Sequence, residues 1–281
     1  MSDLKQLALK LAKDGPHKTL PTPRLVQLLF NGIYIAKTTE ARYVWEHPYY
    51  PHFYIPLTSL HTTADHNPAF QISEGETYHS PAGEPVGTQL LLTVGARTLT
   101  KTISFPPHLP SGSPAATLAG LVKIDFDSID QWFEESAPIF VHPKDPFIRV
   151  EILPSTRSLR VWIDGQQVAT TTSSMHLYET LLPARFYLPL TDVDPTVLRR
   201  SGTRTKCPYK GEAEYYSVEV KGKLYEDVVW YYNSPTIESA QVRGLVCFYN
   251  ERVDIELDGK MLERPSTHFG KASEDKKPAV L

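Results

Sequence analysis

RLVQLLFNGIYIAKTT (24–39) and RSLRVWIDGQQVATTT (157–172) each place two largely apolar runs on either side of a two-residue turn signal, Asn-Gly or Asp-Gly. The tightest turn that joins antiparallel strands needs positive φ at both central residues, which these pairs tolerate well. Each stretch therefore predicts a β-hairpin. Because the same signal occurs twice at an offset of 133, it predicts a duplicated β module.

The two hairpins belong to a longer internal repeat, in which residues 24–60 align without a gap on residues 157–193. Polar and turn residues match as well as apolar ones, which favours a duplication. A feature kept in both copies is expected to serve the fold, whereas a chemically rich feature in one copy is a candidate site. Eleven of the thirty-seven aligned pairs are identical: Arg24/Arg157, Gly32/Gly165, Ala36/Ala169, Thr38/Thr171, Thr39/Thr172, Glu46/Glu179, Phe53/Phe186, Tyr54/Tyr187, Pro56/Pro189, Leu57/Leu190 and Thr58/Thr191.

Further strand signals follow in each copy. The runs 89–94 and 97–103 flank Gly95, and the runs 215–220 and 224–232 flank Lys221-Gly222, so each copy has a second predicted hairpin. GLVKIDFDSID (120–130) matches GLVCFYNERVD (244–254) and predicts a last pair of strands in each copy. The expected fold is mainly β: two tandem, related small β domains built from antiparallel hairpins.

Helix is expected only in short pieces. Leu4, Leu7 and Leu11 share one face of an amphipathic N-terminal helix. Residues 194–201 predict a short helix, because Asp194 can cap it and Pro195 suits its first turn. Residues 235–240 predict a single helical turn.

The length of 281 residues suits two cores. We expect an N-terminal helix and lead-in over 1–20, a diverged first β repeat over 21–145, a second β repeat over 146–262 and a disordered tail over 263–281. Prolines in FEESAPIFVHPKDPF (133–147) predict the linker, with the boundary near residue 145. The two repeats are expected to pack against each other, and the oligomeric state stays open.

The bulk composition narrows the classes of partner. The net charge is -3, and basic residues are scattered among carboxylates, so nucleic acid is not the expected partner. No run approaches the roughly 20 apolar residues that span a bilayer, so no membrane partner is expected. Cys207 and Cys247 are too few for a disulfide framework and have no zinc spacing. A reducing, cytoplasmic location fits best, because the N-terminus lacks the pattern of a signal peptide and its Asp3 and Asp14 disfavour a mitochondrial presequence.

The most chemically loaded stretch is TRTKCPYKGEAEYY (203–216). A lysine near a cysteine can stabilise the thiolate, and Lys210 follows Cys207 by three residues. The alternative is a tight turn with a small buried cysteine and a solvated lysine, and for an isolated stretch this alternative comes first. The first copy changes that balance: in TYHSPAG (77–83), His79 replaces the thiol and Ala82 the amine, so the second copy is the expected functional one.

The second copy resembles the domain of unknown function 427 family over residues 148–260, and the first copy is similar to a diverged instance of the same domain. The resemblance is carried by Leu177, Glu179, Phe186, Tyr187, Pro189, Asp192, Val193, Leu198, TKCPYKG (205–211), Tyr215, Trp230-Tyr231, Pro235, GLVCFY (244–249), Val253, Asp254 and Gly259. It implies a small, mostly β domain and, through the family's name, a nucleotidyltransferase, but no established activity. The shared residues map onto Glu179, Tyr187, Asp192, Thr205, Cys207, Pro208, Lys210, Gly211, Trp230 and Gly244.

Nucleotidyl transfer needs carboxylates that hold Mg²⁺ and an element for the triphosphate. Asp192 and Asp194 would share a face if their segment were extended, but Asp194-Pro195 favours a helix start, and there is no Walker loop. We therefore expect Mg²⁺ only if nucleotidyl transfer is real. His47, His52, His61 and His66 crowd one region without a zinc spacing, so no metal site is expected.

Two functional hypotheses remain. The first is a pocket in the second copy for a small polar metabolite or nucleotide, with Cys207, Lys210, Glu179 and Asp192 as catalytic candidates: Cys207 as nucleophile or redox-sensitive thiol, Lys210 as anion holder and a carboxylate as acid or base. Its ligand-binding candidates are Tyr187, Thr205, Tyr209, Gly211, Trp230 and Tyr231. The second is a non-catalytic tandem β module for protein or ligand interaction, in which the 205–211 loop is architectural.

Overall fold

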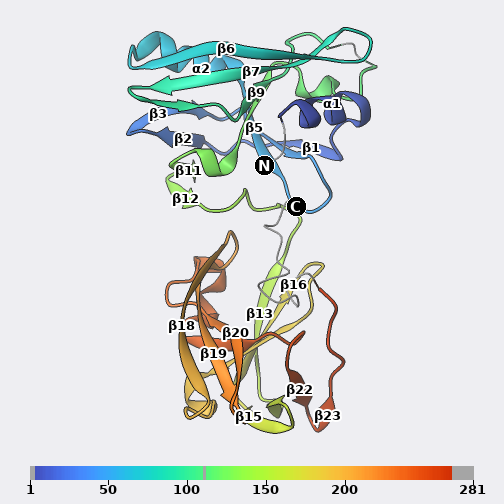
Figure 1. Ribbon diagram of the computed structural model, residues 1–281, viewed down its shortest axis with the longest axis vertical. Coiled ribbons are helices and arrows are strands. Elements are labelled where there is room, and N and C mark those ends of the chain that lie inside the picture. The colour runs from blue at the N-terminus through green and yellow to red at the C-terminus, as the bar shows by residue number, and fades with distance from the viewer. Residues whose placement is uncertain (1–3, 110–111, 268–281) are drawn as a thin grey trace. The chain divides into compact units, whose positions relative to one another are not determined.

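The structure is a computed structural model that describes residues 4–109 and 112–267 (Figure 1). The chain divides into two units between Asp145 and Pro146, which are called repeat 1 and repeat 2 below. Both units are mainly β and are built from antiparallel sheets, as predicted. The predicted tail over 263–281 falls mostly outside the described residues.

Repeat 1 consists of two sheets and two α-helices. One sheet has the order β1 (Lys18–Pro21), β4 (Arg42–Trp45), β5 (His52–Pro56), β10 (Leu121–Ile124), β9 (Thr102–Ser104), β7 (Pro85–Val94) and β6 (Phe70–His79), with β8 (Arg97–Leu99) also paired to β7. The other has the order β12 (Ala137–Ile139), β11 (Gln131–Glu134), β2 (Val26–Phe30) and β3 (Ile33–Thr38). The helices are α1 (Leu4–Asp14) and α2 (Leu57–His66), and the 3₁₀ turns are η1 (Ala116–Leu118) and η2 (Phe126–Ser128).

Repeat 2 has the same arrangement of two sheets. The larger one has the order β13 (Val150–Ser155), β16 (Ser174–Glu179), β17 (Arg185–Pro189), β21 (Leu245–Phe248), β20 (Lys223–Tyr231), β19 (Gly211–Val220) and β18 (Leu198–Cys207). The smaller one has the order β15 (Gln166–Thr171), β14 (Leu159–Ile163), β22 (Asp254–Leu257) and β23 (Lys260–Met261). Its 3₁₀ turns are η3 (Leu190–Asp192) and η4 (Ile237–Val242). Strand by strand, the two larger sheets run in one common order, and so do the two smaller ones.

The two hairpins predicted from Asn-Gly and Asp-Gly are β2–β3 and β14–β15. Asn31 and Gly32 have φ of 48° and 78°, and Asp164 and Gly165 have φ of 47° and 74°. These values are the positive angles that the tight hairpin turn requires. The predicted last pair of strands is also present in each repeat, with one strand in each of the two sheets: β10 and β11 in repeat 1, β21 and β22 in repeat 2.

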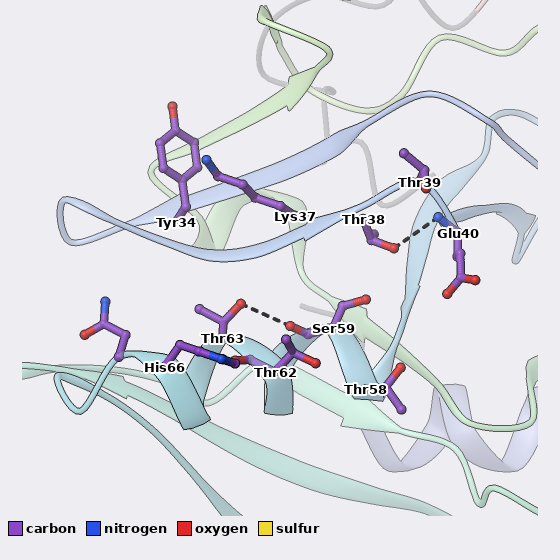
Figure 2. A pocket seen from close by; sticks show the side chains of 11 residues that line it. Tyr34, Lys37, Thr38, Thr39, Glu40, Thr58, Ser59, Thr62, Thr63 and His66 are labelled. Atoms are coloured by element: carbon purple, nitrogen blue, oxygen red, sulfur yellow. Dashed lines mark hydrogen bonds between the residues drawn. The ribbon is translucent and has the colours of Figure 1, made fainter.

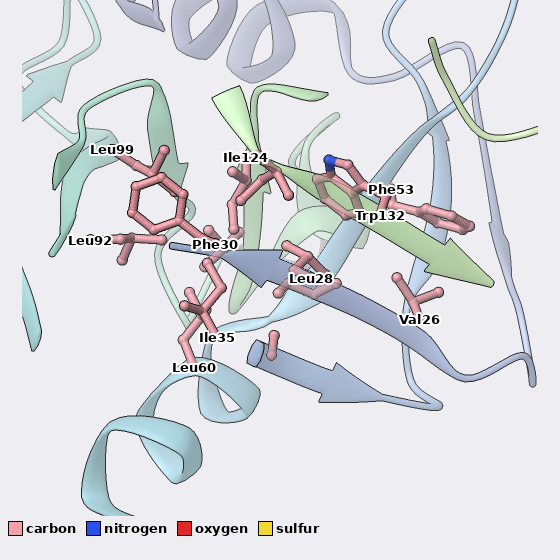
Figure 3. Packing of buried hydrophobic residues seen from close by; sticks show 14 of the residues in the cluster. Val26, Leu28, Phe30, Ile35, Phe53, Leu60, Leu92, Leu99, Ile124 and Trp132 are labelled. Carbon is pink, nitrogen blue, oxygen red and sulfur yellow. The ribbon is translucent and has the colours of Figure 1, made fainter. Parts of the chain in front are cut away.

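The core of repeat 1 lies between its two sheets (Figure 3). Leu28 and Phe30 from β2 meet Leu92 from β7 and Ile124 from β10, and none is more than 3% exposed. Burial of one such side chain contributes roughly 1.5–3 kcal/mol. The equivalent cluster in repeat 2 is built from the corresponding strands and is rich in valine.

The two repeats diverge after an identical Pro-Leu-Thr triplet. In repeat 1 the triplet opens the ten-residue helix α2, whereas in repeat 2 it opens only the turn η3. Asp194 precedes Pro195, and a residue before proline disfavours the α conformation. The prediction of a helix over 194–201 was therefore wrong: the Asp194 carboxylate accepts a hydrogen bond from the Thr196 amide at 2.9 Å in a turn, and β18 begins at Leu198.

The predicted linker over 133–147 was partly wrong. Its first residues form the β11–β12 hairpin of repeat 1, with Glu135 at the turn and a φ of 52°. Pro138 is tolerated because β12 lies at the edge of its sheet. The predicted turn at 235–240 is present as η4, shifted by two residues.

Helix α1 forms as predicted and buries Leu7, Ala8 and Leu11. Its buried residues cluster with Val44 and Tyr54 on the face of the larger sheet that points away from the smaller one. No helix among the described residues is long and apolar enough to cross a membrane.

Candidate functional site

The motif loop 205–211 is the tip of the β18–β19 hairpin. Cys207 ends β18 and pairs with Gly211, the first residue of β19. Gly211 has a φ of 100°, and a Cβ there would lie 3.1 Å from the Ser234 carbonyl oxygen, so glycine is required by conformation and by space. Hydrogen bonds from the η4 region hold the tip in place. The Tyr209 carbonyl accepts them from the hydroxyls of Thr236, just before η4, and Ser239, within η4, at 2.5 and 3.2 Å.

Lys210 and Glu179 form a buried ion pair. The Lys210 ammonium donates to a Glu179 carboxylate oxygen at 2.5 Å, and the two side chains are only 11% and 8% exposed. Burial acts to lower the pKa of Lys210, but the neighbouring Cys207 and Glu179 outweigh it, and the pKa is raised. Lys210 therefore stays charged, held between a carboxylate and a thiol.

The two thiols of the chain differ in exposure. Cys207 is half-buried beside Lys210, whereas Cys247 in β21 is fully buried. Burial raises the pKa of Cys247 to about 12, although nearby Arg185 and Lys210 act in the opposite direction. Cys207 is thus the more exposed of the two cysteines, and Cys247 is a small core residue.

Tyr187 and Trp230 form an aromatic layer under this cluster. The Trp230 indole donates to the Tyr187 hydroxyl at 3.0 Å, and the rings meet edge to face at 6.2 Å. They are 0% and 6% exposed. Burial, followed by the neighbouring Cys247, raises the pKa of Tyr187 far above its usual range. These two predicted ligand-binding residues are packed inside the fold.

The remaining predicted residues lie away from the ion pair. Thr205 is exposed and bonds the Tyr215 hydroxyl at 2.7 Å. Tyr231 packs against the core between the sheets, whereas its neighbour Trp230 belongs to the cluster on the other face, as the alternation of a strand requires. Its hydroxyl donates to Glu214 at 3.1 Å.

Asp192 lies apart from Glu179. Glu179 ends β16 beyond the first residue of β17, and Asp192 lies in η3 beyond the last residue of β17. A five-residue strand at about 3.3 Å per residue puts roughly 13 Å between its ends. Asp194 accepts hydrogen bonds from the Thr196 amide and hydroxyl at 2.9 and 2.6 Å, both on the same carboxylate oxygen. No group of three or more histidine, cysteine, aspartate or glutamate side chains in the described segments is placed to hold a metal ion.

Repeat 1 has a buried acid–lysine pair at the same place, built differently. Glu46, the counterpart of Glu179, is paired with Lys123 at 2.7 Å and accepts a hydrogen bond from Tyr54 at 3.0 Å. Lys123 lies in β10 where repeat 2 has Cys247. Burial acts to raise the pKa of Glu46, but Lys123 and His52 outweigh it and the pKa is lowered. The turn with Ala82 thus lacks a lysine, and the buried glutamate of repeat 1 takes its lysine partner from β10 instead.

Sequence reasoning missed Lys123, although a signal was present. Lys123 interrupts the apolar run of β10, whose four residues are all buried, and a lysine in such a run needs a buried partner. Reasoning also missed how the first site is covered: Lys10 of α1 donates to the Glu46 carbonyl at 2.7 Å, so the helix closes this face of repeat 1.

The four crowded histidines of repeat 1 are not one cluster. His47 and His52 have ring centroids 5.7 Å apart, and burial lowers the pKa of both, to about 4 for His52. His61 and His66 lie on α2 and are exposed. Each repeat has a cavity: a groove in repeat 1, and in repeat 2 a cavity of about 330 Å³ lined by Ser155, Ser174 and Met175. Neither is lined by Cys207 or Lys210.

Comparison with known proteins agrees with the duplicated architecture. A family model described as a domain of unknown function (DUF427) matches residues 18–74 and 151–259, which is more than half of the chain. The two matched segments fall in the two repeats, on either side of the division between Asp145 and Pro146. A search of curated proteins finds no match.

Proposed function

Since the chain belongs to the domain of unknown function (DUF427) family, we propose that repeat 2 holds its functional site, for a small polar metabolite or nucleotide at the tip of the β18–β19 hairpin. In this proposal Cys207 is the reactive group, Lys210 stabilises its thiolate, and Glu179 is a positioning residue for Lys210. The observation that carries the proposal is one buried ammonium placed beside both the thiol and the carboxylate.

The electrostatics support these roles. A thiolate is the nucleophilic form of cysteine, and a neighbouring ammonium favours it. Lys210 is fixed in place, because it is 11% exposed and bonded to Glu179. Cys207 is half-buried, whereas Cys247 belongs to the buried aromatic cluster, so Cys207 is the thiol on which we expect a ligand to act.

The same geometry favours thiol chemistry over nucleotidyl transfer by paired carboxylates. Glu179 is engaged by Lys210, and Asp192 lies at the opposite end of β17. A nucleotide remains a candidate ligand through its polar groups, with Lys210 as the anion holder.

A ligand screen on the full chain tests the proposal. Wild type, Lys210→Ala and the surface control Lys260→Ala would be melted with ATP and GTP, each with Mg²⁺, and with small carboxylic acids. A ligand at one hundred times its Kd stabilises the folded state by about 2.7 kcal/mol. We expect one class to stabilise wild type and Lys260→Ala but not Lys210→Ala, and to protect Cys207 from iodoacetamide. Absence of stabilisation by every compound, or equal stabilisation of Lys210→Ala, contradicts the proposal.

A second candidate function is a non-catalytic β module, and one observation favours it. Repeat 1 keeps a buried acid–lysine pair, although its corresponding turn, TYHSPAG (77–83), has no thiol. Such a pair can therefore serve the fold alone. Under this reading the 205–211 loop is an anchored turn. It predicts that Cys207 reacts like any half-exposed thiol and that no compound of the screen raises the melting temperature.

A further inference from the structure

In repeat 2, a later segment of the same chain pairs with the edge strand β15. Val193 forms an antiparallel bridge with Ala169, and the Asp194 amide donates to the Val168 carbonyl at 2.9 Å. The residues after β17 thus occupy, over a short stretch, the place of a further strand beside β15. This edge is therefore able to accept an extended peptide backbone.

Repeat 1 has the same edge without that occupant. The counterparts of Val168 and Ala169 are Ile35 and Ala36 in β3, and the counterpart of Val193 is Leu60, which lies in α2. Over residues 4–109 and 112–267, β3 pairs only with β2 and ends its sheet. Because α2 is helical, its residues do not run as an extended strand beside β3, and the amide of its first residue, Leu57, donates to the Gly120 carbonyl at 3.0 Å instead.

A groove of about 590 Å³ lies between β3 and α2 (Figure 2). Hydroxyl side chains line it from both sides: Thr38 at the end of the strand and Thr39 after it, and Thr58, Ser59, Thr62 and Thr63 on the helix. Leu60 is fully buried and already fills the apolar position that Val193 fills in repeat 2. An occupant of the groove therefore needs backbone and polar groups, not an apolar anchor.

We propose that this groove binds an extended peptide segment of a partner protein, which adds antiparallel to the free edge of β3. Addition of a strand to an exposed edge is a common mode of peptide recognition, in which main-chain hydrogen bonds supply the affinity. Ile35, the counterpart of Val168, is fully buried and does not line the groove, so the peptide pairs further along β3. By the alternation of an antiparallel ladder, the Lys37 amide is the next outward-facing donor.

Charge at the two ends of the groove defines the direction of the peptide. Lys37 lies over the Tyr34 ring at 4.2 Å, and His66 lies toward the same end, whereas Glu40 lies at the other (Figure 2). In an antiparallel peptide the C-terminal half faces Tyr34 and the N-terminal half faces Glu40. The preferred segment carries polar side chains, with a basic residue before an acidic one.

A random ten-residue peptide library displayed on phage, selected against the full chain, tests the proposal. Lys37→Pro removes the outward amide at an exposed edge position that tolerates proline, and Lys37→Ala is its matched control, because it loses the same charge but keeps the amide. Thr62→Trp fills the groove from the exposed side of α2 without changing β3. Melting curves verify that each variant folds, and synthetic copies of the selected peptides are measured by fluorescence anisotropy.

We expect Lys37→Ala to bind selected peptides up to about fivefold more weakly than wild type, through the lost charge. Lys37→Pro should bind up to about tenfold more weakly than Lys37→Ala, since this is what one main-chain hydrogen bond is worth in affinity, and Thr62→Trp should bind about tenfold more weakly than wild type. N-methylation of the peptide on alternate residues should abolish binding. The proposal is overturned if no peptide is enriched, or if Lys37→Pro and Thr62→Trp bind as wild type does. It is equally overturned if wild type sediments as a dimer that Lys37→Pro dissociates, because the occupant of the edge is then a second copy of the chain.

Discussion

The two repeats bury the same glutamate but neutralise it with lysines from different places. Glu46 is paired with Lys123 from the middle of the larger sheet, and Glu179 with Lys210 from a hairpin tip. A buried carboxylate needs a partner, but the fold leaves the origin of that partner free. The position of the lysine determines which groups surround it. Lys123 in β10 lies within the sheet, whereas Lys210 at the hairpin tip lies beside the half-buried Cys207.

The repeats also differ in what covers the outer face of the larger sheet. Helix α1 lies on the outer face of the larger sheet of repeat 1, and Lys10 reaches the carbonyl of Glu46. On the same face of repeat 2, the aromatic layer around Tyr187 and Trp230 lies beside η4 and the motif loop. The face that a helix covers in repeat 1 is thus covered in repeat 2 by aromatic side chains next to the motif loop.

The largest expected effect concerns the pair in repeat 1. Glu46→Ala leaves the Lys123 ammonium, 6% exposed, without its carboxylate, which should cost about 3–5 kcal/mol of stability. Differential scanning calorimetry would measure the loss, with the exposed Glu40→Ala as control. The double variant Glu46→Gln, Lys123→Met should regain most of the loss. A drop of less than about 1 kcal/mol in the single variant would show that the pair does not hold repeat 1 together.

Moving the lysine tests whether the two pairs are interchangeable. Lys210→Ala should cost about 2–4 kcal/mol, because Glu179 is left buried and unpaired. Adding Cys247→Lys places an ammonium where repeat 1 has Lys123 and should recover about half of that loss. Cys247→Met is the matched control, since it adds length without charge. Equal melting temperatures for the lysine and methionine versions would refute the equivalence of the two positions.

Histidine burial should make repeat 1 sensitive to acid. The pKa of His52 is lowered to about 4, mainly by burial, while the unfolded chain keeps a value of about 6.5. The unfolded state then binds more protons between these values, so stability is complete above pH 6.5 and falls as pH drops toward 4, by at most about 3 kcal/mol. His52→Asn should flatten this slope, and the exposed His61→Asn should not. Part of the slope should remain, because burial also lowers the pKa of His47 and His142. An unchanged slope in His52→Asn contradicts the assignment.

The smallest effect compares two glycines at the same turn. Gly83 and Gly211 both have positive φ, but a Cβ at Gly83 would meet nothing within 4 Å, whereas one at Gly211 would press on the Ser234 carbonyl. Gly83→Ala should cost about 1 kcal/mol through conformation alone, and Gly211→Ala about 1 kcal/mol more. Urea unfolding of both variants would show whether the tip in repeat 2 is the more tightly packed one.

Local signals in the sequence predicted most of the fold. Asn31-Gly32 and Asp164-Gly165 determine their own turns, and the leucines of α1 share one helical face, so both features could be read without the tertiary structure. The helix predicted over 194–201 failed because Pro195 acts on the residue before it. The linker prediction failed because the prolines near β12 are compatible with an edge strand.

The candidate site was harder to predict because its contacts are distant in sequence. The motif pointed to Cys207 and Lys210, and Glu179, 31 residues away, does join Lys210. Asp192 came with the family resemblance, but the length of β17 keeps it from Glu179. The link between Glu46 and Lys123 spans 77 residues, and only the folded sheet brings these side chains together.

The most direct test of the central claim is the rate at which iodoacetamide alkylates Cys207 at neutral pH, with the adduct located by mass spectrometry. If Lys210 activates the thiol, Lys210→Ala should react about tenfold more slowly than wild type, because the ammonium beside the sulfur is gone. Glu179→Gln should react faster, because the ammonium is then left to the thiolate alone. Equal rates in wild type, Lys210→Ala and Glu179→Gln would contradict the account and leave the pair with the architectural role that it has in repeat 1.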